Sequence, residues 1–535
     1  AREWIDKFKG QFNGGWDELR EEIYERQLKL GVIPPNTALT KRPEQVPAWS
    51  DYPERYRPVA SRLMETFAGF LAHTDAQVGR VIDALERMNI MDNTLVVYIT
   101  GDNGASAEGT VNGAWSAPSF QNGLPEDPEW LLAHMDDFGT ARCENHFNLA
   151  WAWALDAPFQ WMKQVASHFG GTRNAMAVSW PKGITDAGGL RTQFHHVVDI
   201  APTIYEACGI TQPSSVNGIE QMEVHGTSMA YTFDDADVAD RHETQYFEIM
   251  GNRGVYHQGW MASCFHGRPP WIRWQGMPFD GEQERWELYD LRTDFSQAVD
   301  VAAQYPEKLA ELMEVFDREA RRNSVYPMRD PGSGSQLVAP VPSSLGDLTK
   351  MTYTSVHARM PEFSVVNVKN TSWRMTAVVE VGEGAHGVIA CQGGNMAGWS
   401  LYLSELGVPT FHYNWFGHQH TSVVAPTALI AGRHEIDMLF AYDGGFAAGG
   451  DVALSVDGVL VAEGHVPNTV PVIFSMSGET FDVGVDTGAP VGPYPHQFEF
   501  TGRIVGVTIE RLGERPEAVL QAMRDGQIRA SIASQ

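Results

Sequence analysis

The 535-residue sequence is too long for one hydrophobic core of ordinary size, so about two to four domains are expected. Its 43% hydrophobic and 20% charged residues are typical of folded globular proteins and argue against a disordered chain. With 67 carboxylates against 39 lysines and arginines, the net charge of −28 disfavours nucleic acids and anionic membranes as partners. An anionic ligand would therefore need local positive charge, from a metal ion or a few cationic side chains.

The sequence leaves the compartment open, as either cytoplasmic or periplasmic and secreted. No apolar run reaches the length of about 18 residues that a membrane span needs, so no transmembrane segment is expected. The first ten residues lack a signal-peptide pattern, although the chain begins with Ala1 rather than methionine. The cysteines have no metal-binding or disulfide spacing, and we expect buried free thiols at Cys143, Cys208, Cys264 and Cys391.

The first part of the chain has the pattern of an α/β fold. Apolar residues recur at spacings of three and four from Ser61 to Met88, which predicts a helix with one buried face. The apolar run from Leu95 to Ile99 predicts a buried strand, as in a parallel α/β sheet, and Ala175 to Trp180 predicts a second one. A further helix is expected from Asp199, its N-cap, to Cys208.

The sequence predicts five consecutive regions. An α/β unit spans residues 1–240, and a small α+β subdomain with a helix from Pro306 to Arg321 spans residues 241–327. A Gly- and Ser-rich linker spans 328–350, and short β-type runs over 351–515 fit an all-β sandwich or jelly roll. Within them, Asp457-Gly458 between two apolar runs predicts a hairpin. We expect a helical tail over 516–535.

The segment Gly101-Asp102-Asn103-Gly104 follows the first predicted strand directly. Ligands of open α/β sheets gather beyond the carboxyl ends of strands, and a carboxylate next to an amide oxygen suits Ca²⁺ or Mg²⁺. The same residues are also common in tight turns without any ligand. Two oxygen atoms fall short of the about six to eight that Ca²⁺ takes, so a metal site needs partners from elsewhere.

Several segments resemble arylsulfatases of the sulfatase family, which belongs to the alkaline-phosphatase-like superfamily. The run Thr94–Gly104 is similar to the family's strand and metal-binding loop, and His73–Arg80 is similar to the helix before it. Pro158–Lys163 and His168–Arg173 resemble its lysine loop, and Trp286–Leu291 resembles its C-terminal subdomain. The pieces occur in family order, which makes the joint match more specific than any one of them.

The resemblance implies part of an alkaline-phosphatase-like three-layer sandwich with a small α+β subdomain, followed by the β-sandwich. It implies hydrolysis of small-molecule or carbohydrate sulfate esters, with Ca²⁺ as the cofactor and Mg²⁺ as the alternative. Asp102 and Asn103 would bind the metal, and Lys163 would be catalytic and contact the sulfate or its leaving oxygen. His168 would contact the substrate, although a histidine beside a Gly-Gly turn is equally a structural hydrogen-bonding residue.

Sulfatases use a formylglycine nucleophile made within a Cys/Ser-x-Pro-x-Arg motif, and this sequence contains no such motif. Ala1-Arg-Glu-Trp4 resembles a point partway into the family's α/β domain. The expectation is therefore an N-terminally truncated sulfatase, with the nucleophile and the other metal ligands upstream and little activity in this fragment alone.

The C-terminal region resembles the concanavalin-like or laminin-G-like sandwiches appended to some bacterial arylsulfatases. The aromatic cluster His412, Tyr413, Trp415 and Phe416 could stack on sugar rings, but core packing is the favoured interpretation. Asp482 and Asp486 are explicable as solvent-facing positions. Two alternatives stay open: a phosphatase or phosphodiesterase of the same superfamily, and a glycan-binding protein that acts through the sandwich.

Overall fold

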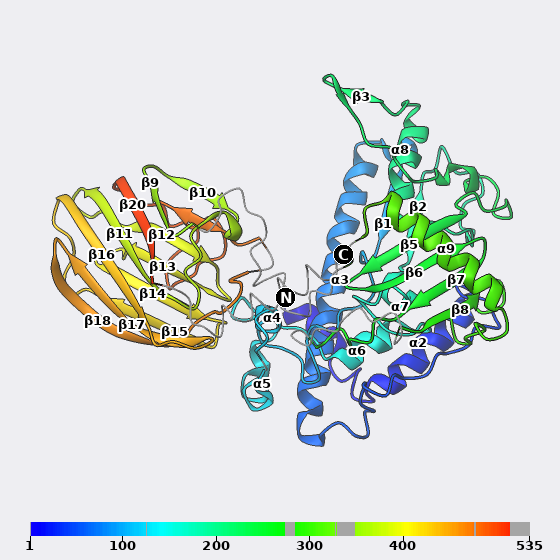
Figure 1. Ribbon diagram of the computed structural model, residues 1–535, viewed down its shortest axis with the longest axis horizontal. Coiled ribbons are helices and arrows are strands. Elements are labelled where there is room, and N and C mark those ends of the chain that lie inside the picture. The colour runs from blue at the N-terminus through cyan, green and yellow to red at the C-terminus, as the bar shows by residue number, and fades with distance from the viewer. Residues whose placement is uncertain are drawn as a thin grey trace. The chain divides into compact units, whose positions relative to one another are not determined.

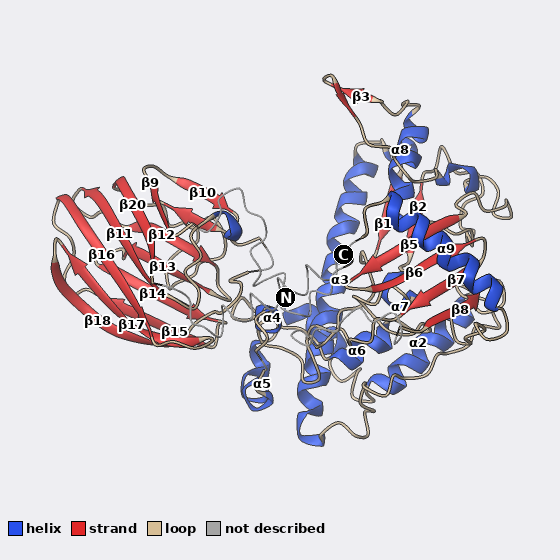
Figure 2. Ribbon diagram, viewed as in Figure 1, coloured by secondary structure: helices blue, strands red, loops and turns tan. Residues whose placement is uncertain are grey.

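The chain divides into two units in a computed structural model that describes residues 2–124, 126–272, 284–326, 328, 348–475 and 478–513 (Figures 1 and 2). The first unit comprises Ala1–Ala107, Phe147–Trp271 and Met277–Asp330. The second comprises Glu108–His146, Ile272–Gly276 and Pro331–Gln535. The predicted tail, and the predicted linker between Met328 and Leu348, lie outside the described residues.

Helix α3 (Arg57–Arg87) confirms the helix predicted from Ser61 to Met88. Pro58 occupies its first turn, where a missing N–H costs nothing. The part of the helix up to Gly69 buries residues such as Leu63 and Met64, whereas the part after it leaves Phe70 65% and Val81 61% exposed. The apolar face of the helix is thus packed only in its N-terminal part.

The two predicted strands form, but their predicted environment is wrong. β1 (Val96–Ile99) and β2 (Met176–Ser179) pair antiparallel, with Val97 opposite Val178. Both are partly or fully exposed rather than buried. The physical reason is that no third strand joins this sheet among the described residues, so the apolar side chains lack a covering layer.

Shorter helices surround these elements. The α2–α6 contact is built on aromatic residues: Trp16 and Trp151, both fully buried, meet edge to face at 5.5 Å between ring centroids. In α8 the predicted stop is confirmed, since Gly209 ends the helix in the left-handed conformation with φ +65°. The helices are α1 (Arg2–Ile5), α2 (Trp16–Leu30), α6 (Leu149–Leu155), α7 (Phe169–Thr172) and α8 (Ile200–Cys208).

The predicted α+β subdomain is a four-stranded antiparallel sheet in the order β5-β6-β7-β8, covered by α9 (Pro306–Arg322) (Figure 2). Leu312 and Phe316 of α9 pack on Val255 and Leu288 of the sheet. The strands are β5 (Thr244–Ile249), β6 (Asn252–His257), β7 (Trp260–Cys264) and β8 (Trp286–Asp290). A short hairpin, β3 (Ser215–Val216) with β4 (Ile219–Glu220), precedes them.

The second unit confirms the predicted all-β sandwich. Its two six-stranded antiparallel sheets have the orders β10-β19-β12-β13-β14-β15 and β18-β17-β16-β11-β20-β9. The predicted hairpin turn is present, with φ +52° at Asp457 and +79° at Gly458. The strands are β9 (Lys350–Tyr353), β10 (His357–Met360), β11 (Ser372–Val381), β12 (Gly387–Gly393), β13 (Gly398–Leu403), β14 (Pro409–Trp415), β15 (Gln419–Val424), β16 (Gly432–Tyr442), β17 (Ala448–Val456), β18 (Val459–Asn468), β19 (Phe481–Val483) and β20 (Arg503–Leu512).

The segment Glu108–His146, which lies within the predicted α/β unit of residues 1–240, groups with the second unit in the structure. It carries α4 (Ala117–Gln121) and α5 (Pro128–His134). The buried Asn122 accepts the main-chain N–H groups of Val472 and Ile473 at 2.8 and 3.1 Å and donates to the Ile473 carbonyl at 2.9 Å. These contacts join positions far apart in sequence, which no local pattern reveals.

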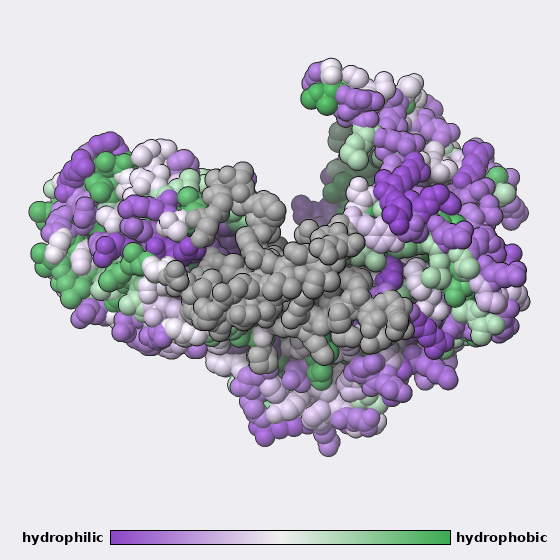
Figure 3. Space-filling view, in the orientation of Figure 1, coloured by the Kyte–Doolittle hydropathy of each residue, from purple (hydrophilic) through white to green (hydrophobic). Residues whose placement is uncertain are grey.

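The surface agrees with the composition. Hydrophilic residues predominate on the face of the first unit in Figure 3. Of the helices in the described ranges, none combines the length and apolarity required to cross a membrane. Three of the four cysteines are buried, as expected, whereas Cys208 is exposed.

Candidate functional site

The loop after β1 is held by two glycines. Gly101 adopts φ +82°, a conformation that side chains disfavour. Gly104 lies against α7 so closely that a Cβ atom would come within 1.7 Å of the Gly170 carbonyl oxygen, and its N–H donates to Gly171 at 3.1 Å. Between them, the Asn103 side chain donates to Asp102 Oδ1 at 2.8 Å. The loop therefore presents the carboxylate and the amide side by side.

Asp156 anchors the residue that follows this loop. Its two carboxylate oxygens accept the main-chain N–H of Ala105 at 2.9 and 3.1 Å. Burial raises the pKa of Asp156 well above its usual range, against the opposing effect of the Ala105 N–H and of Arg20. Burial likewise lowers the pKa of Arg20 to about 9, although Asp156 favours its charged form.

Lys163 lies beside the same loop because its main-chain N–H donates to the Ala105 carbonyl at 3.1 Å. The lysine side chain is half-buried. None of the ion pairs between described residues includes either Lys163 or Asp102. Both charges are thus free to meet a ligand.

Asp102, Asn103 and Lys163 line one pocket of about 450 Å³ in the first unit. The structure therefore brings together the three residues that the sequence analysis singled out for metal binding and catalysis. The rest of the pocket comes from segments that the analysis did not select: Gln164, Ala166, Gly171, Thr172, His196, Val198, His225, Thr244–Ile249, Glu319, Arg322 and Asn323.

His196 belongs to this pocket and was missed. Its Nδ1 accepts the Val198 N–H at 3.4 Å, and its ring contacts Phe247 edge to face at 5.6 Å. Burial lowers the pKa of His196 despite the nearby Asp199 carboxylate, so the ring is neutral at pH 7. The available signal was the spacing His196-x-x-Asp199, which forms a capping box at a short helical turn.

Asp199 is the acceptor of several hydrogen bonds next to His196, and we call this group of residues the Asp199 hub. The buried carboxylate accepts the His196 N–H at 2.9 Å, the Thr227 N–H at 2.8 Å and His242 Nδ1 at 2.8 Å. Although burial opposes it, hydrogen bonds from His195 and His242 lower the pKa of Asp199. His195 is therefore a structural residue, while its neighbour His196 reaches the pocket, because adjacent side chains point to different sides.

His225 was also missed, and its place depends on tertiary packing. The next residue, Gly226, lies so close to Val198 that a Cβ atom would come within 2.0 Å of the Val198 carbonyl oxygen. The His225 side chain stays 41% exposed, with Nε2 4.0 Å from the Glu223 carboxylate. No motif in the sequence analysis pointed to this loop.

His168, expected to contact substrate, does not line the pocket. It is buried, its Nδ1 lies 2.9 Å from Ser167 Oγ, and its Nε2 lies 3.1 Å from Glu287 Oε2. Because both ring nitrogens have partners within the protein, the alternative reading of a structural hydrogen-bonding residue fits the geometry.

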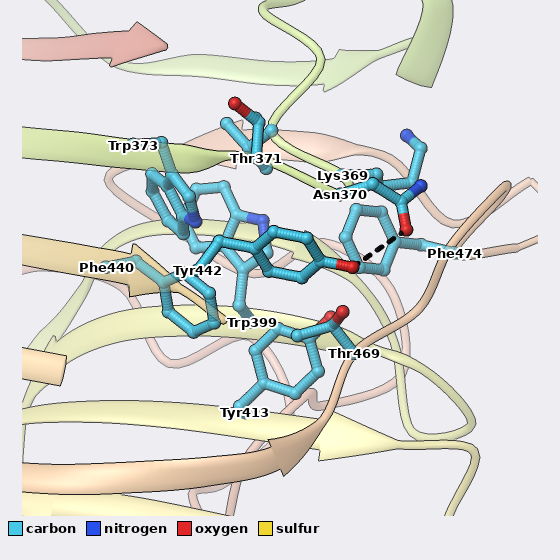
Figure 4. A pocket seen from close by; sticks show the side chains of 11 residues that line it. Lys369, Asn370, Thr371, Trp373, Trp399, Tyr413, Phe440, Tyr442, Thr469 and Phe474 are labelled. Atoms are coloured by element: carbon cyan, nitrogen blue, oxygen red, sulfur yellow. Dashed lines mark hydrogen bonds between the residues drawn. The ribbon is translucent and has the colours of Figure 1, made fainter. Parts of the chain in front are cut away.

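The aromatic cluster of the sandwich has the packing role that was favoured. His412, Tyr413 and Phe416 are buried, and Trp415 packs against the core. Figure 4 shows Trp373, Trp399 and Tyr413 around a cavity between the sheets, where the Tyr442 hydroxyl donates to Asn370 at 3.3 Å. The cavity has room for about one water molecule, too little for a sugar ring.

Asp482 and Asp486 are not solvent-facing as expected, since both are buried beside Cys391. One ligand atom from each of the three lies within 4.8 Å of the others. However, Asp482 accepts the Thr487 N–H at 2.8 Å, and Asp486 accepts the Tyr494 hydroxyl at 2.8 Å. Both carboxylates therefore already accept hydrogen bonds from residues of the same loop.

In a comparison with known proteins, residues 2–210 match the sulfatase family. The chain is 26% identical over 323 residues to an uncharacterized sulfatase of Schizosaccharomyces pombe, covering 59% of this chain and 54% of that protein. It is 28% identical over 229 residues to the arylsulfatase of Klebsiella aerogenes, covering 43% of this chain and 47% of that protein. The chain spans about half the length of these curated relatives.

Two solved structures show weaker likeness. One comes from work on glycosaminoglycan metabolism by Bacteroides thetaiotaomicron, with 17% identity, a TM-score of 0.32, and coverage of 49% of this chain and 45% of that one. The other is the mouse laminin α1 chain, domains LG4-5, with 16% identity, a TM-score of 0.21, and coverage of 32% and 40%. Residues 2–210 therefore resemble the sulfatase family, and the second unit contains an all-β sandwich of two antiparallel sheets.

Proposed function

We propose that this chain takes part in the hydrolysis of sulfate esters and that the pocket of the first unit binds the sulfate group. The observation that carries the proposal is that Lys163 and Asp102 line one pocket and that neither forms an ion pair with a described residue. A free ammonium group can contact the anion directly. The exposed Asp102 carboxylate of the same pocket can bind a cation, which in turn would attract sulfate.

The donor set fits a hard cation. Asp102 and Asn103 offer a carboxylate and an amide oxygen on a rigid loop, which suits Ca²⁺, with Mg²⁺ as the alternative. When bound, such a cation stabilises negative charge on the sulfuryl oxygens. The remaining ligands and the nucleophile are not assigned to residues of this sequence, because no cysteine or serine lies in the formylglycine motif.

Lys163 and His196 supply different interactions. The Lys163 ammonium group would hold a sulfuryl or leaving oxygen as negative charge develops there. Neutral His196 would donate through Nε2–H, because its Nδ1 accepts the Val198 N–H.

Calcium titration of Asp102→Ala tests the proposal. The chain offers a matched control, because Asp92 and Asn93 form a second Asp-Asn pair, in a 3-10 turn outside the pocket. We expect calcium to raise the melting temperature of the unchanged chain and of Asp92→Ala, but not of Asp102→Ala. Equal calcium response in all three would contradict the metal site. In a form of the protein that hydrolyses 4-nitrophenyl sulfate, a rate that is unchanged in Asp102→Ala would contradict the proposed reaction.

A further inference from the structure

Lys163 lies in a tight turn with unusual backbone geometry. This turn, Met162–Val165, is called the lysine turn, and a main-chain hydrogen bond of 3.2 Å joins its last residue to its first. Gln164, the residue after Lys163, has φ +76°, and Trp161, two residues before Lys163, has φ +64°. Side chains disfavour this left-handed region, and a turn with positive φ at its third residue ordinarily has glycine there. The conformation therefore needs support from neighbouring segments.

Asn252 supports Gln164 from the sheet of the α+β subdomain. Its Nδ2 donates to the Gln164 carbonyl oxygen at 2.8 Å, and its Oδ1 accepts the His266 N–H at 3.0 Å. Asn252 is only 2% exposed, so water is kept away from both hydrogen bonds. This residue begins β6 and pairs with Ile249 of β5. The position of the lysine turn therefore follows the position of this sheet.

Trp161 is supported by the same subdomain. Its ring stacks on Phe265, with 4.3 Å between the ring centroids and 26° between the ring planes. Phe265 directly follows β7, which pairs with β6. Two neighbouring strands thus hold the two left-handed residues that flank Lys163.

Helix α7 leaves the lysine turn no room to shift towards it. A Cβ atom on Gly170 would come within 2.4 Å of the Trp161 carbonyl oxygen, and one on Gly171 would come within 2.3 Å of the Val165 carbonyl oxygen. The main chains of the helix and the turn are thus in direct contact. Because Gly171 also accepts the Gly104 N–H at 3.1 Å, this contact fixes the turn relative to the candidate metal loop.

We infer that Asn252 is a positioning residue, which orients Lys163 in the pocket by holding Gln164 in its left-handed conformation. The inference rests on the proposed function, because Lys163 is the side chain proposed to bind the sulfate group. Without the Asn252 donor, the carbonyl group of the buried Gln164 loses its hydrogen bond, and Gln164 would return to an ordinary backbone conformation. That change rotates the peptide unit between Lys163 and Gln164, and the lysine side chain moves with it.

Combining Asn252→Ala with Gln164→Gly tests the inference, because glycine adopts positive φ readily and should no longer need Asn252. Calorimetric titration of the full chain with inorganic sulfate, in calcium chloride, gives the dissociation constant. We expect Asn252→Ala to weaken sulfate binding about tenfold, and the double variant to bind within about twofold of Gln164→Gly alone. Lys163→Ala removes the ammonium group itself and should weaken binding at least as much as Asn252→Ala.

Asn148→Ala is the matched control, because Asn148 is also buried in the first unit, but its side chain donates to the Tyr52 hydroxyl at 3.3 Å. It should lower the melting temperature and leave sulfate binding unchanged. Asn252→Asp is a second variant in case Asn252→Ala does not fold, since it keeps the acceptor for His266 and loses only the donor. A folded Asn252→Asp protein that binds sulfate like the unchanged chain would overturn the inference.

Acetylation of lysines, followed by mass spectrometry, reports the position of Lys163 without any sulfate. The half-buried Lys163 should react at least about twofold faster in Asn252→Ala, relative to the exposed Lys182, and return to its original rate in the double variant. A purely structural role of Asn252 would not make this rate depend on glycine at position 164.

The outcomes separate this inference from the proposed function. If sulfate binding depends on Lys163 but is unchanged in Asn252→Ala, or is not restored by glycine at position 164, the inference falls and the sulfate site stands. If no sulfate binds, or if Lys163→Ala does not weaken its binding, the proposed function falls. The acetylation rate then decides alone: a change that glycine reverses retains the positioning role, and an unchanged rate overturns it.

Discussion

The main-chain N–H of Lys163 donates to the carbonyl oxygen of Ala105, whose own N–H donates to the carboxylate of Asp156. Ala105, which lies two positions after Asn103, therefore connects the candidate metal ligands Asp102 and Asn103 to the candidate sulfate-binding Lys163. This connection holds the main chain of Lys163 beside the loop that carries Asp102 and Asn103. Small displacements of catalytic groups are costly, so the anchor itself is open to mutational test.

Lys163→Ala should reduce turnover of an aryl sulfate by about 10²–10³-fold, because one preorganised cation that stabilises developing charge is lost. The exposed Lys182 provides the control, since Lys182→Ala removes the same charge outside the pocket. Steady-state rates with 4-nitrophenyl sulfate measure the effect in the active protein. Comparable losses in both variants would show that general charge matters, rather than the position of Lys163.

Asp156→Ala should lower the free energy of unfolding by about 1–3 kcal/mol, because the main-chain N–H of Ala105 loses its acceptor. Asp156→Asn keeps an acceptor oxygen and should cost less. Urea unfolding, together with calcium titration, measures both stability and site geometry. An unchanged calcium affinity in a folded Asp156→Ala protein would refute the positioning role.

The Asp199 hub should make stability depend on pH in opposite senses at the two ends of the range. Burial disfavours the charged ring of His242, but Asp199 raises the pKa of this histidine above the ordinary 6.5. The contribution of the His242–Asp199 interaction to folding stability is therefore complete below about pH 6.5. It is lost as the pH rises through the raised pKa. The pKa of Asp199 is lowered in the folded protein, so the Asp199 carboxylate contributes to folding stability above pH 3.8. This contribution to stability is lost as the pH falls through the lowered pKa.

Melting temperatures from pH 3 to 9 should therefore be highest between these limits, and His242→Gln should flatten the alkaline side specifically. A His242→Gln protein with the same alkaline slope as the unchanged chain would assign that slope to other groups. The exposed His465 offers a control position, because it belongs to the second unit and pairs with Asp451 rather than with Asp199.

Asn122→Ala should destabilise the sandwich by about 1–3 kcal/mol, because the main-chain N–H groups of Val472 and Ile473 lose their buried acceptor.

Trp115→Ala should lower the free energy of unfolding by about 3–5 kcal/mol, since this buried ring packs against Trp130, Phe138 and His418. Differential scanning calorimetry can assign the loss to one transition. Normal stability of residues 348–513 without the segment Glu108–His146 would contradict its structural role.

Local interactions explain what could be predicted. The helix near Ser61–Met88 follows from contacts three and four residues apart, and the Asp457–Gly458 turn follows from backbone conformations that those two residues adopt easily. The resemblance of the segments around Asp102, Asn103 and Lys163 to sulfatases depends on short runs in order along the chain. Residue identity and spacing were sufficient for these features.

Long-range packing decided the rest. The exposure of β1 and β2, the placement of the segment Glu108–His146 in the sandwich, and the burial of Asp482 all depend on partners distant in sequence. So does the pocket, where His196 and strand β5 meet the predicted residues. The sequence by itself determined which elements form and which side chains are the candidates for the chemistry. Only the tertiary structure decided what surrounds them, because burial and pocket shape arise from contacts that no local pattern encodes.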